Sequence, residues 1–294
     1  MALIKKYLSL IKFSHTVFAL PFALVGFFLG VRSLLSEAEE VVIDFGFYAF
    51  SLMLVILCMV FARSAAMAFN RYLDRHFDAK NPRTVIREIP AGLLSANQVL
   101  WFTIIMSALF MLTAWLINTI CFILSPVALL VILGYSYTKR FTALCHLVLG
   151  LGLSLAPTGA FLSMTGYFSW EPIVLSFAVL FWVAGFDIIY ALQDEGFDKE
   201  QGLKSIPVSL GGEKALRLSR IFHLITAVLL FILGWMIKGG LFYYTGAGIF
   251  TALLIYQHTL VKPTDLRKVN QAFFTTNGLA SIIFGVFAIL DLLT

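Results

Sequence analysis

The amino-acid sequence predicts an all-α protein that crosses a membrane many times, and three observations lead to this fold class. First, 60% of the 294 residues are hydrophobic, 13% are charged, and the mean hydropathy is +0.93. A soluble domain carries about twice this share of charge, so much of the apolar surface must face lipid. Second, long stretches of the chain lack Asp, Glu, Lys and Arg. Third, these stretches show no period-two alternation, which excludes membrane β-strands. The composition also excludes a disordered chain, a disulfide scaffold and an ordinary cytosolic enzyme.

Taken in chain order, each uncharged stretch predicts one membrane-spanning helix, because a helix needs about 20 apolar residues to cross the hydrocarbon core. The stretch 89–138 is too long for one helix, and Ile117-Asn118-Thr119 divides it into two. We therefore expect nine spans around a central cavity, in a single domain covering residues 1–294. The predicted spans are 14–34, 45–69, 98–116, 119–137, 143–166, 172–192, 218–237, 240–260 and 271–292.

The amino-terminal segment needs separate justification, because three lysines precede the first span as they would in a signal peptide. Acidic residues follow this span without a clear small-x-small cleavage site, which favours a retained helix. Residues 1–13, MALIKKYLSLIKF, predict a short amphipathic helix on the membrane surface.

The distribution of basic residues predicts the orientation in the membrane. Of the 21 Lys and Arg residues, 18 fall on one side of the predicted spans, Arg32 and Lys238 fall on the other, and Arg63 lies within a span. Because cytoplasmic loops carry excess Lys and Arg, the amino terminus is expected in the cytoplasm and the carboxyl terminus outside. The predicted location is the inner (cytoplasmic) membrane of the cell. This topology accounts for the net charge of +5, and no nucleic-acid partner is expected.

Two long cytoplasmic segments, 70–97 and 187–217, each begin with a carboxylate motif at the end of a predicted span. Asn70, Asp74 and Asp78 are spaced i, i+4 and i+8, so a helix places them on one face. In the second motif, Tyr190, Asp194 and Asp198 follow Asp187. The residue pairs 70/190, 74/194 and 78/198 are each 120 positions apart, which predicts a repeat of four plus four helices with a ninth left over.

These motifs predict a magnesium-dependent site for a diphosphate. The alternative is that the carboxylates form solvated helix ends or salt bridges, but two clusters in the same register make that less favoured. Oxygen ligands without His or Cys suit Mg²⁺, which usually keeps open positions for substrate phosphates. Basic residues follow the motifs where an anion would need them, although positive-inside bias alone could explain each one. The candidates are Arg83, Arg87, Lys139, Arg140 and Lys204.

Arg63 lies seven residues before Asn70, about 10 Å deeper along the same helix. An ionised side chain within a span is costly and indicates function by default, so Arg63 is predicted to bind the carboxylate of an acidic substrate. The alternatives are a structural pair with Asp187 and an arginine that extends to the interface. His15 in the first span is a further candidate for the cavity lining, although a lone His is more often a packed core residue.

The stretches NRYLDRHFDAKNPRT, YSYTKR and DIIYALQDEGFDKEQGLKS resemble the UbiA superfamily of intramembrane prenyltransferases over residues 5–290. That resemblance implies a fold of nine helices and transfer of a prenyl group from a polyprenyl diphosphate to an aromatic or other acceptor. It assigns the metals to Asn70, Asp74, Asp78, Asp194 and Asp198, and the diphosphate to Lys139, Arg140 and Arg83. It also places Asp187 beside the reacting carbon or the metals. The candidate catalytic residues are therefore Asp187, Asp74 and Asp194.

The branch within the superfamily determines the acceptor that is expected. Arg63 in the arrangement Arg-x6-Asn resembles the branch that prenylates hydroxybenzoate in ubiquinone synthesis. The stretches Arg87-Glu88-Ile89-Pro90 and His15-Thr16-Val17-Phe18-Ala19-Leu20-Pro21 instead resemble bacterial relatives tied to menaquinone made through futalosine. The expected acceptor is therefore a 4-hydroxybenzoate-like acid or a dihydroxynaphthoate, with Arg63, His15 and Tyr190 as its candidate contacts. A porphyrin, chlorophyll-type or phosphosugar acceptor is the alternative within the enzyme class. A membrane transporter is the alternative outside it, since repeats and intramembrane charges mark transporters too.

Overall fold

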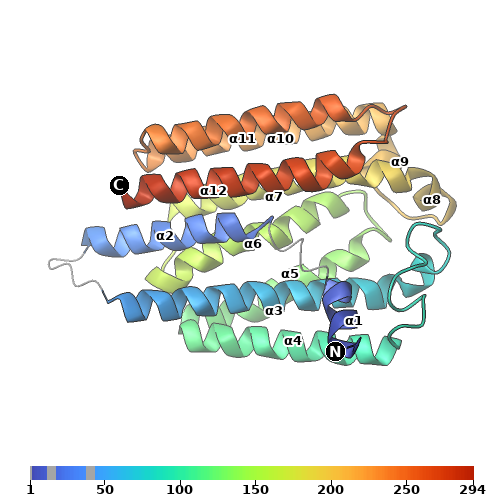
Figure 1. The fold of residues 1–294 in the computed structure, drawn as a ribbon, viewed down its shortest axis with the longest axis horizontal. Coiled ribbons are helices and arrows are strands. Elements are labelled where there is room, and N and C mark those ends of the chain that lie inside the picture. The colour runs from blue at the N-terminus through green and yellow to red at the C-terminus, as the bar shows by residue number, and fades with distance from the viewer. Residues whose placement is uncertain (1, 12–17, 38–43) are drawn as a thin grey trace.

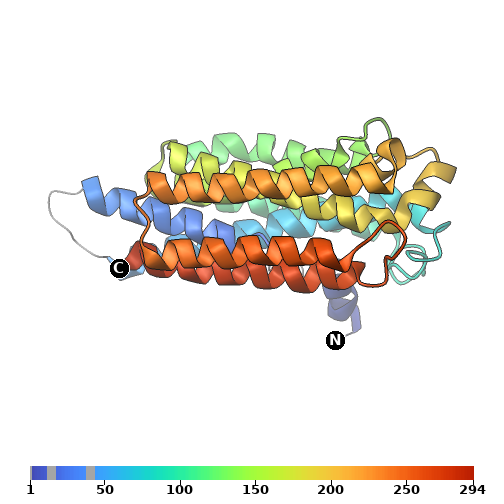
Figure 2. The ribbon, with the colours of Figure 1, turned by 90° about the horizontal axis from the view of Figure 1, so that it is seen from above.

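The computed structural model describes residues 2–11, 18–37 and 44–294, and these residues form helices and loops without a β-strand. The long helices lie side by side with their axes along one common direction (Figure 1, Figure 2). They are α2 (Leu20–Glu37), α3 (Phe45–Asp78), α4 (Ala96–Ile117), α5 (Thr119–Thr138), α6 (Cys145–Thr165), α7 (Trp170–Ala191), α10 (Gly212–Met236), α11 (Leu241–Leu260) and α12 (Asn277–Leu293). The all-α class predicted from composition is confirmed.

Seven helical segments within the described residues are long and apolar enough to cross a membrane. They contain α3, α4, α5, α6, α7, α10 and α12, and each overlaps one of the predicted spans. The two remaining predicted spans overlap α2 and α11, which fall outside this set of seven. The chain is therefore a multi-pass helical membrane protein, while the count of nine passes stays a prediction.

The division of the longest uncharged stretch occurs where the sequence predicts it. Asn118 has an extended backbone, with φ −167° and ψ 170°, so it ends α4 and caps α5. Its side-chain oxygen accepts a hydrogen bond from the backbone N–H of Cys121 at 2.9 Å, as an N-cap residue does. Its Nδ2 donates to the Leu162 carbonyl of α6 at 2.8 Å, which anchors the turn to the neighbouring helix.

The core is aromatic and tightly packed. Phe22 of α2 packs against Trp182 of α7 and Phe284 of α12, with ring centroids 5.0 and 5.6 Å apart. Small residues allow the helix backbones to approach: a Cβ added at Gly26 of α2 would lie 2.2 Å from the Pro157 carbonyl oxygen of α6. The largest apolar side chains on the outside, such as Trp235 at 77% exposure, are suited to contact with lipid.

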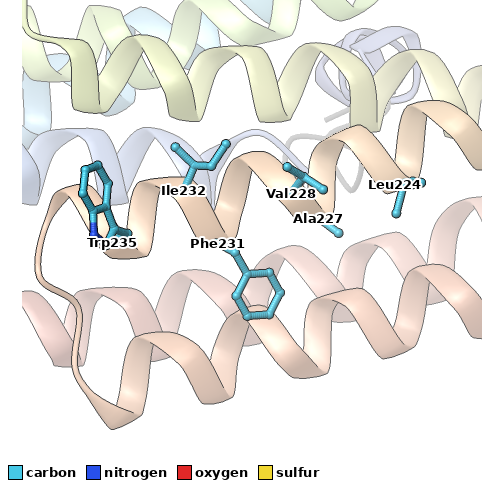
Figure 3. Close-up of a pocket in the computed structure, with 6 residues that line it drawn as sticks. All are labelled: Leu224, Ala227, Val228, Phe231, Ile232 and Trp235. Carbon is cyan, nitrogen blue, oxygen red and sulfur yellow. The ribbon is translucent and has the colours of Figure 1, made fainter.

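A shallow groove of about 520 Å³ follows the outer face of α10 (Figure 3). Its six lining residues are all apolar and all belong to α10: Leu224, Ala227, Val228, Phe231, Ile232 and Trp235. Because no carboxylate or basic residue lines it, this groove is part of the lipid-facing surface and not the candidate active site.

The carboxylate motifs gather at one end of the bundle, opposite the end where the carboxyl terminus lies (Figure 1). Helix α3 continues unbroken through Asp78, so the first connecting segment is 79–95 and shorter than the predicted 70–97. After α7 the chain forms a short 3₁₀ helix, η2 (Leu192–Asp194), and the short helices α8 (Glu195–Glu200) and α9 (Ile206–Leu210). The second motif therefore passes from α7 into a 3₁₀ turn after Ala191, whereas the first stays within the single helix α3.

The predicted amino-terminal helix is present as α1 (Ala2–Ile11). It does not simply lie on a surface, because its Leu10 is fully buried in a cluster with Ala68, Leu94 and Val99. Ser9 donates a 2.6 Å hydrogen bond to Glu88 in segment 79–95. Helix α1 thus contacts the segment that follows the first motif.

Candidate active site

Arg83 joins the two carboxylate motifs. It lies in segment 79–95 after the first motif, and its Nε donates to Asp194 Oδ1 of the second motif at 3.0 Å. Its Nη2 contacts Asp194 Oδ2 as well, so the pair is bidentate. Its Nη1 donates to the Tyr190 hydroxyl at 2.9 Å, and Cζ lies 5.2 Å from the centre of the Tyr190 ring. Segments about 110 residues apart in sequence therefore form one site.

The residues that follow α5 reach both motifs. Lys139 Nζ lies 2.7 Å from Asp198 Oδ2 of the second motif. The next residue, Arg140, donates from Nη2 to Asp74 Oδ1 of the first motif at 3.1 Å. Two adjacent basic residues thus turn toward opposite carboxylate clusters, and they lie between them.

The first motif forms the single face that its spacing predicts. Asn70 Nδ2 donates to Asp74 Oδ2 at 2.9 Å, one turn along α3. Arg87 donates to Asp78 Oδ1 at 2.6 Å. The second oxygen of Asp78, Oδ2, is buried and has no hydrogen-bond partner in the described part of the chain. An uncompensated buried carboxylate oxygen is costly, and a cation would satisfy it.

The motif residues fit a magnesium ion by their donor chemistry. All the candidate ligands are oxygen donors, and Asp78 Oδ2 is a free one. No three His, Cys, Asp or Glu side chains of the described ranges converge closely enough to hold a metal ion by themselves. Mg²⁺ rarely uses such a cage, since it is usually held by one or two carboxylates, water and substrate phosphates. The site therefore suits a metal that arrives with an anionic substrate.

Carboxylate neighbours favour the charged forms of Arg83 and Lys139, which both lie outside the spans. Burial disfavours the charge on Arg83, but Asp194 and Tyr190 outweigh burial and raise the pKa of its guanidinium. Burial also disfavours the charge on Lys139, and the contact with Asp198 outweighs it and raises the pKa of the ammonium group. Each can therefore contribute a fixed positive charge to an anion-binding site.

Lys204 lies beside this cluster but is oriented differently. Its backbone N–H donates to the Lys139 carbonyl at 2.7 Å, which brings the segment after the second motif to the end of α5. Its Nζ donates to the Phe141 carbonyl at 3.2 Å. The ammonium group contacts no motif carboxylate among these bonds, so its role in diphosphate binding stays a prediction.

Arg63 and Asp187, which the sequence offered as a possible pair, have separate surroundings. Asp187 Oδ2 lies 2.7 Å from Nδ1 of His146. Arg63 Nε is buried and has no hydrogen-bond partner among the described residues. A buried guanidinium nitrogen without a partner is available to an anionic ligand. His15, the other candidate in this region, lies outside the described residues.

Tyr190 belongs to an aromatic wall on the side of the site that faces α12. Its ring centre lies 4.2 Å from that of Phe273, which also packs against Phe186 at 5.2 Å. Phe273 is part of a π-helical turn, η3 (Gln271–Thr276), that precedes α12. Single π-helical turns are frequent at functional sites.

Sequence reasoning missed His146, Phe273 and the buried pair of Arg71 with Glu88. Arg71 Nε lies 3.9 Å from Glu88 Oε2, and both side chains are less than 10% exposed. His146 and Phe273 lie in or beside apolar stretches without a motif. Their position relative to the carboxylates could be known only from the fold. The sequence did offer a reason to single out Glu88, because it is an acidic residue within an otherwise basic segment.

The chain is similar in sequence to known prenyltransferases. The UbiA prenyltransferase family matches residues 19–279. The 4-hydroxybenzoate octaprenyltransferase of Tolumonas auensis is 32% identical over 240 residues, covering 81% of this chain and 84% of that protein. The 4-hydroxybenzoate octaprenyltransferase of Vibrio cholerae is 32% identical over 226 residues, covering 77% and 79%.

Solved structures share the fold. A UbiA homolog from Aeropyrum pernix K1 is 30% identical with a TM-score of 0.81, covering 94% of this chain and 98% of that one. A UbiA homolog from Archaeoglobus fulgidus bound to GPP and Mg²⁺ is 24% identical with a TM-score of 0.71, covering 98% and 100%.

Proposed function

Because this chain belongs to the UbiA prenyltransferase family and is a prenyltransferase, we propose that it transfers a polyprenyl group to the ring of an aromatic acid in quinone biosynthesis. The donor is a polyprenyl diphosphate, and the reaction depends on Mg²⁺. The observation that carries the proposal is the meeting of both carboxylate motifs with Arg83, Lys139 and Arg140 at one end of the bundle. The names of the relatives support the aromatic acid, and family membership favours an enzyme over a transporter.

The metal-binding and diphosphate-binding roles divide between the carboxylates and the basic residues. Asn70, Asp74 and Asp78 from α3, with Asp194 and Asp198 from the second motif, would hold Mg²⁺. When bound, the ion supplies positive charge that neutralises the diphosphate leaving group. Arg83, Lys139, Arg140 and Lys204 would bind the diphosphate oxygens. In this proposal the basic side chains exchange their carboxylate partners for phosphate oxygens when the substrate binds.

The mechanism follows from charge. The bond between the allylic carbon and the diphosphate oxygen breaks, and its electron pair leaves with the diphosphate, which Arg83, Lys139 and Arg140 stabilise. The allylic carbon gains positive charge, and the aromatic wall of Tyr190 and Phe273 can stabilise it by about 0.5–2 kcal/mol per contact. The electron-rich ring then forms the new carbon–carbon bond and loses a proton. Water must be kept from the cation, because it would otherwise capture it.

Arg63 supports a carboxylated acceptor. Its buried Nε without a partner suits the carboxylate of an aromatic acid, and its depth below Asn70 separates that carboxylate from the diphosphate. Tyr190 and His15 complete the proposed acceptor contacts. The acceptor is a 4-hydroxybenzoate-like acid or a dihydroxynaphthoate, and the reaction takes place at the cytoplasmic face of the inner membrane.

The test is a transfer assay on the purified full chain in detergent or lipid nanodiscs. The protein is incubated with Mg²⁺, a polyprenyl diphosphate and, in separate reactions, 4-hydroxybenzoate, a dihydroxynaphthoate and a porphyrin, and the products are identified by mass. We expect a prenylated aromatic acid and no product with the porphyrin. A prenylated porphyrin, or no product with either acid, would contradict the proposal.

A further inference from the structure

Asp187 differs from the other motif carboxylates in the kind of partner it has. Asp74, Asp78, Asp194 and Asp198 each contact an Arg or Lys side chain. Asp187 instead contacts the imidazole of His146, with Oδ2 and Nδ1 2.7 Å apart. The His146 side chain is 2% exposed and that of Asp187 is 22% exposed. The imidazole is therefore enclosed by protein, while the carboxylate stays partly exposed.

The hydrogen-bond partners of His146 define its tautomer. The backbone N–H of Ile206 lies 3.3 Å from Nε2 of His146. A backbone amide can only donate, so Nε2 must accept and cannot carry a proton. The imidazole proton is therefore on Nδ1, where it is donated to Asp187. Both ring nitrogens are used, which fixes the plane of the ring and the carboxylate that it contacts.

Helices hold His146 and its backbone partner Ile206 in place. His146 is the second residue of α6, and Ile206 begins α9, whose first turn is capped by Ser205. The residue before this cap, Lys204, donates its backbone N–H to the Lys139 carbonyl at 2.7 Å. The segment that fixes His146 is therefore the segment that fixes Lys139, which contacts Asp198. The position of Asp187 is coupled in this way to the proposed diphosphate site.

We infer that His146 is a positioning residue for the transfer reaction, holding the Asp187 carboxylate in a single orientation beside the reacting groups. This inference rests on the proposed function. Asp187 lies seven residues before Asp194, roughly 10 Å toward the membrane interior at the helical rise. Tyr190 lies between the two and contacts Arg83. A fixed negative charge at this depth stabilises the positive charge that develops on the substrate below the leaving diphosphate.

The test compares His146→Leu, His146→Asn, Asp187→Asn and the double variant Asp187→Asn/His146→Leu in the transfer assay. Leu fills the buried volume without a donor, whereas the amide of Asn stands near Nδ1 and can still donate to Asp187. For His146→Leu we expect kcat to fall about 10- to 100-fold, with KM for both substrates within about twofold of wild type. His146→Asn should recover most of the rate. The double variant should be no slower than Asp187→Asn.

Further losses in the double variant, or an Asn variant as slow as Leu with an unchanged melting temperature, would overturn the positioning role. A histidine ¹⁵N spectrum provides a second measurement, in which the His146 signal is identified by its loss in His146→Leu. We expect a neutral imidazole protonated on Nδ1, and a signal from a proton on Nε2 would contradict the inference. No transfer by the wild type to any acid would overturn the proposed function and this role with it, whereas full activity of His146→Leu would overturn the positioning role alone.

Discussion

At the scale of single residues, Arg83 is the most informative side chain of the site. It makes three hydrogen bonds to the second motif from a segment that follows the first. In the proposed mechanism the same guanidinium binds the diphosphate, so it both closes the site and neutralises the leaving group. Planar, bidentate recognition is specific to Arg, and a Lys carries the charge without the geometry.

Arg83→Ala should lower turnover by about 100-fold or more, because a charge-assisted bidentate contact is lost in the transition state. The turnover of Arg83→Lys should lie between that of Arg83→Ala and that of the wild type. Arg75→Ala is the matched control, since Arg75 donates to the Tyr72 carbonyl of its own helix and contacts no motif carboxylate. The measurement is kcat/KM for the prenyl diphosphate. Equal losses for Arg75→Ala and Arg83→Ala would show a general effect of surface charge.

Arg63→Ala should mainly weaken binding of the aromatic acid. A charge-assisted hydrogen bond contributes about 1.5–3 kcal/mol, which corresponds to roughly a 10- to 100-fold loss of acceptor affinity. The affinity for the prenyl diphosphate should be unchanged. The melting temperature should not fall, because the variant removes a buried Nε that has no hydrogen-bond partner among the described residues. A loss of diphosphate affinity instead would assign Arg63 to the phosphate site or to the fold.

Residue spacing predicted part of this site and could not predict the rest. The i, i+4 spacing of Asn70 and Asp74 predicted a shared face, and the hydrogen bond between them confirms it. The partner of Asp187 was beyond this reasoning, because His146 is 41 residues away and contacts it only after α6 and α7 pack together. Spacing also left Arg63 with two candidate partners, and among the ion pairs of the described residues none joins Arg63 to Asp187, whose Oδ2 contacts His146 instead.

At the scale of elements, α1, α3 and segment 79–95 are held together by a small buried polar cluster. Glu88 accepts a hydrogen bond from Ser9 of α1 and lies 3.9 Å from Arg71 of α3. Since Arg83 and Arg87 belong to the same segment, this cluster supports the position of two basic residues of the site. Hydrophobic patterning predicted helix α1, but only the fold showed that its Ser9 and Leu10 face the protein.

Glu88→Leu should destabilise the protein, because it removes the carboxylate paired with the buried Arg71 guanidinium and leaves Asp78, which also contacts Arg87, as the neighbouring carboxylate. Breaking a buried pair in this way costs about 3–5 kcal/mol, whereas replacing both partners with apolar residues is close to neutral. Thermal melting in detergent should therefore show a large fall for Glu88→Leu and recovery in Arg71→Met/Glu88→Leu. The control is Glu213→Leu, which breaks an exposed pair with Arg217 and should leave melting nearly unchanged. Failure of the double variant to recover would mean that Glu88 acts through Ser9 and not through Arg71.

At the scale of the whole molecule, uncharged stretches predicted the helices well because the length of a spanning helix is fixed by the membrane. The helices α4, α5, α6 and α11 begin and end within about two residues of their predicted bounds. The breaks after Ala191 and the π-helical turn before Asn277 were not predicted, since they depend on packing between helices and not on hydropathy. The return of segment 79–95 to the second motif was likewise a property of the folded bundle.

The orientation across the membrane can be tested with single cysteines at Lys80 and Lys199. Both residues are exposed; Lys80 follows the end of α3 and Lys199 lies in α8. In a background without Cys58, Cys121 and Cys145, both positions should react with an impermeant reagent only from the cytoplasmic side. Lys238→Cys at the opposite end should react only from outside. Labelling of position 80 or 199 from outside would reverse the predicted topology.

The central claim is that the two motifs form a single magnesium-dependent diphosphate site. The most direct test measures the turnover of Asp74→Asn, Asp194→Asn and the double variant, each with Mg²⁺ and with a chelator. Either single change should lower turnover by several orders of magnitude, and the double should be little worse than the poorer single, because residues that act as a unit are strongly non-additive. Wild-type activity should disappear in the chelator and return with Mg²⁺. Multiplicative losses in the double variant, near-full turnover of either single, or full wild-type activity without a divalent ion would contradict the account.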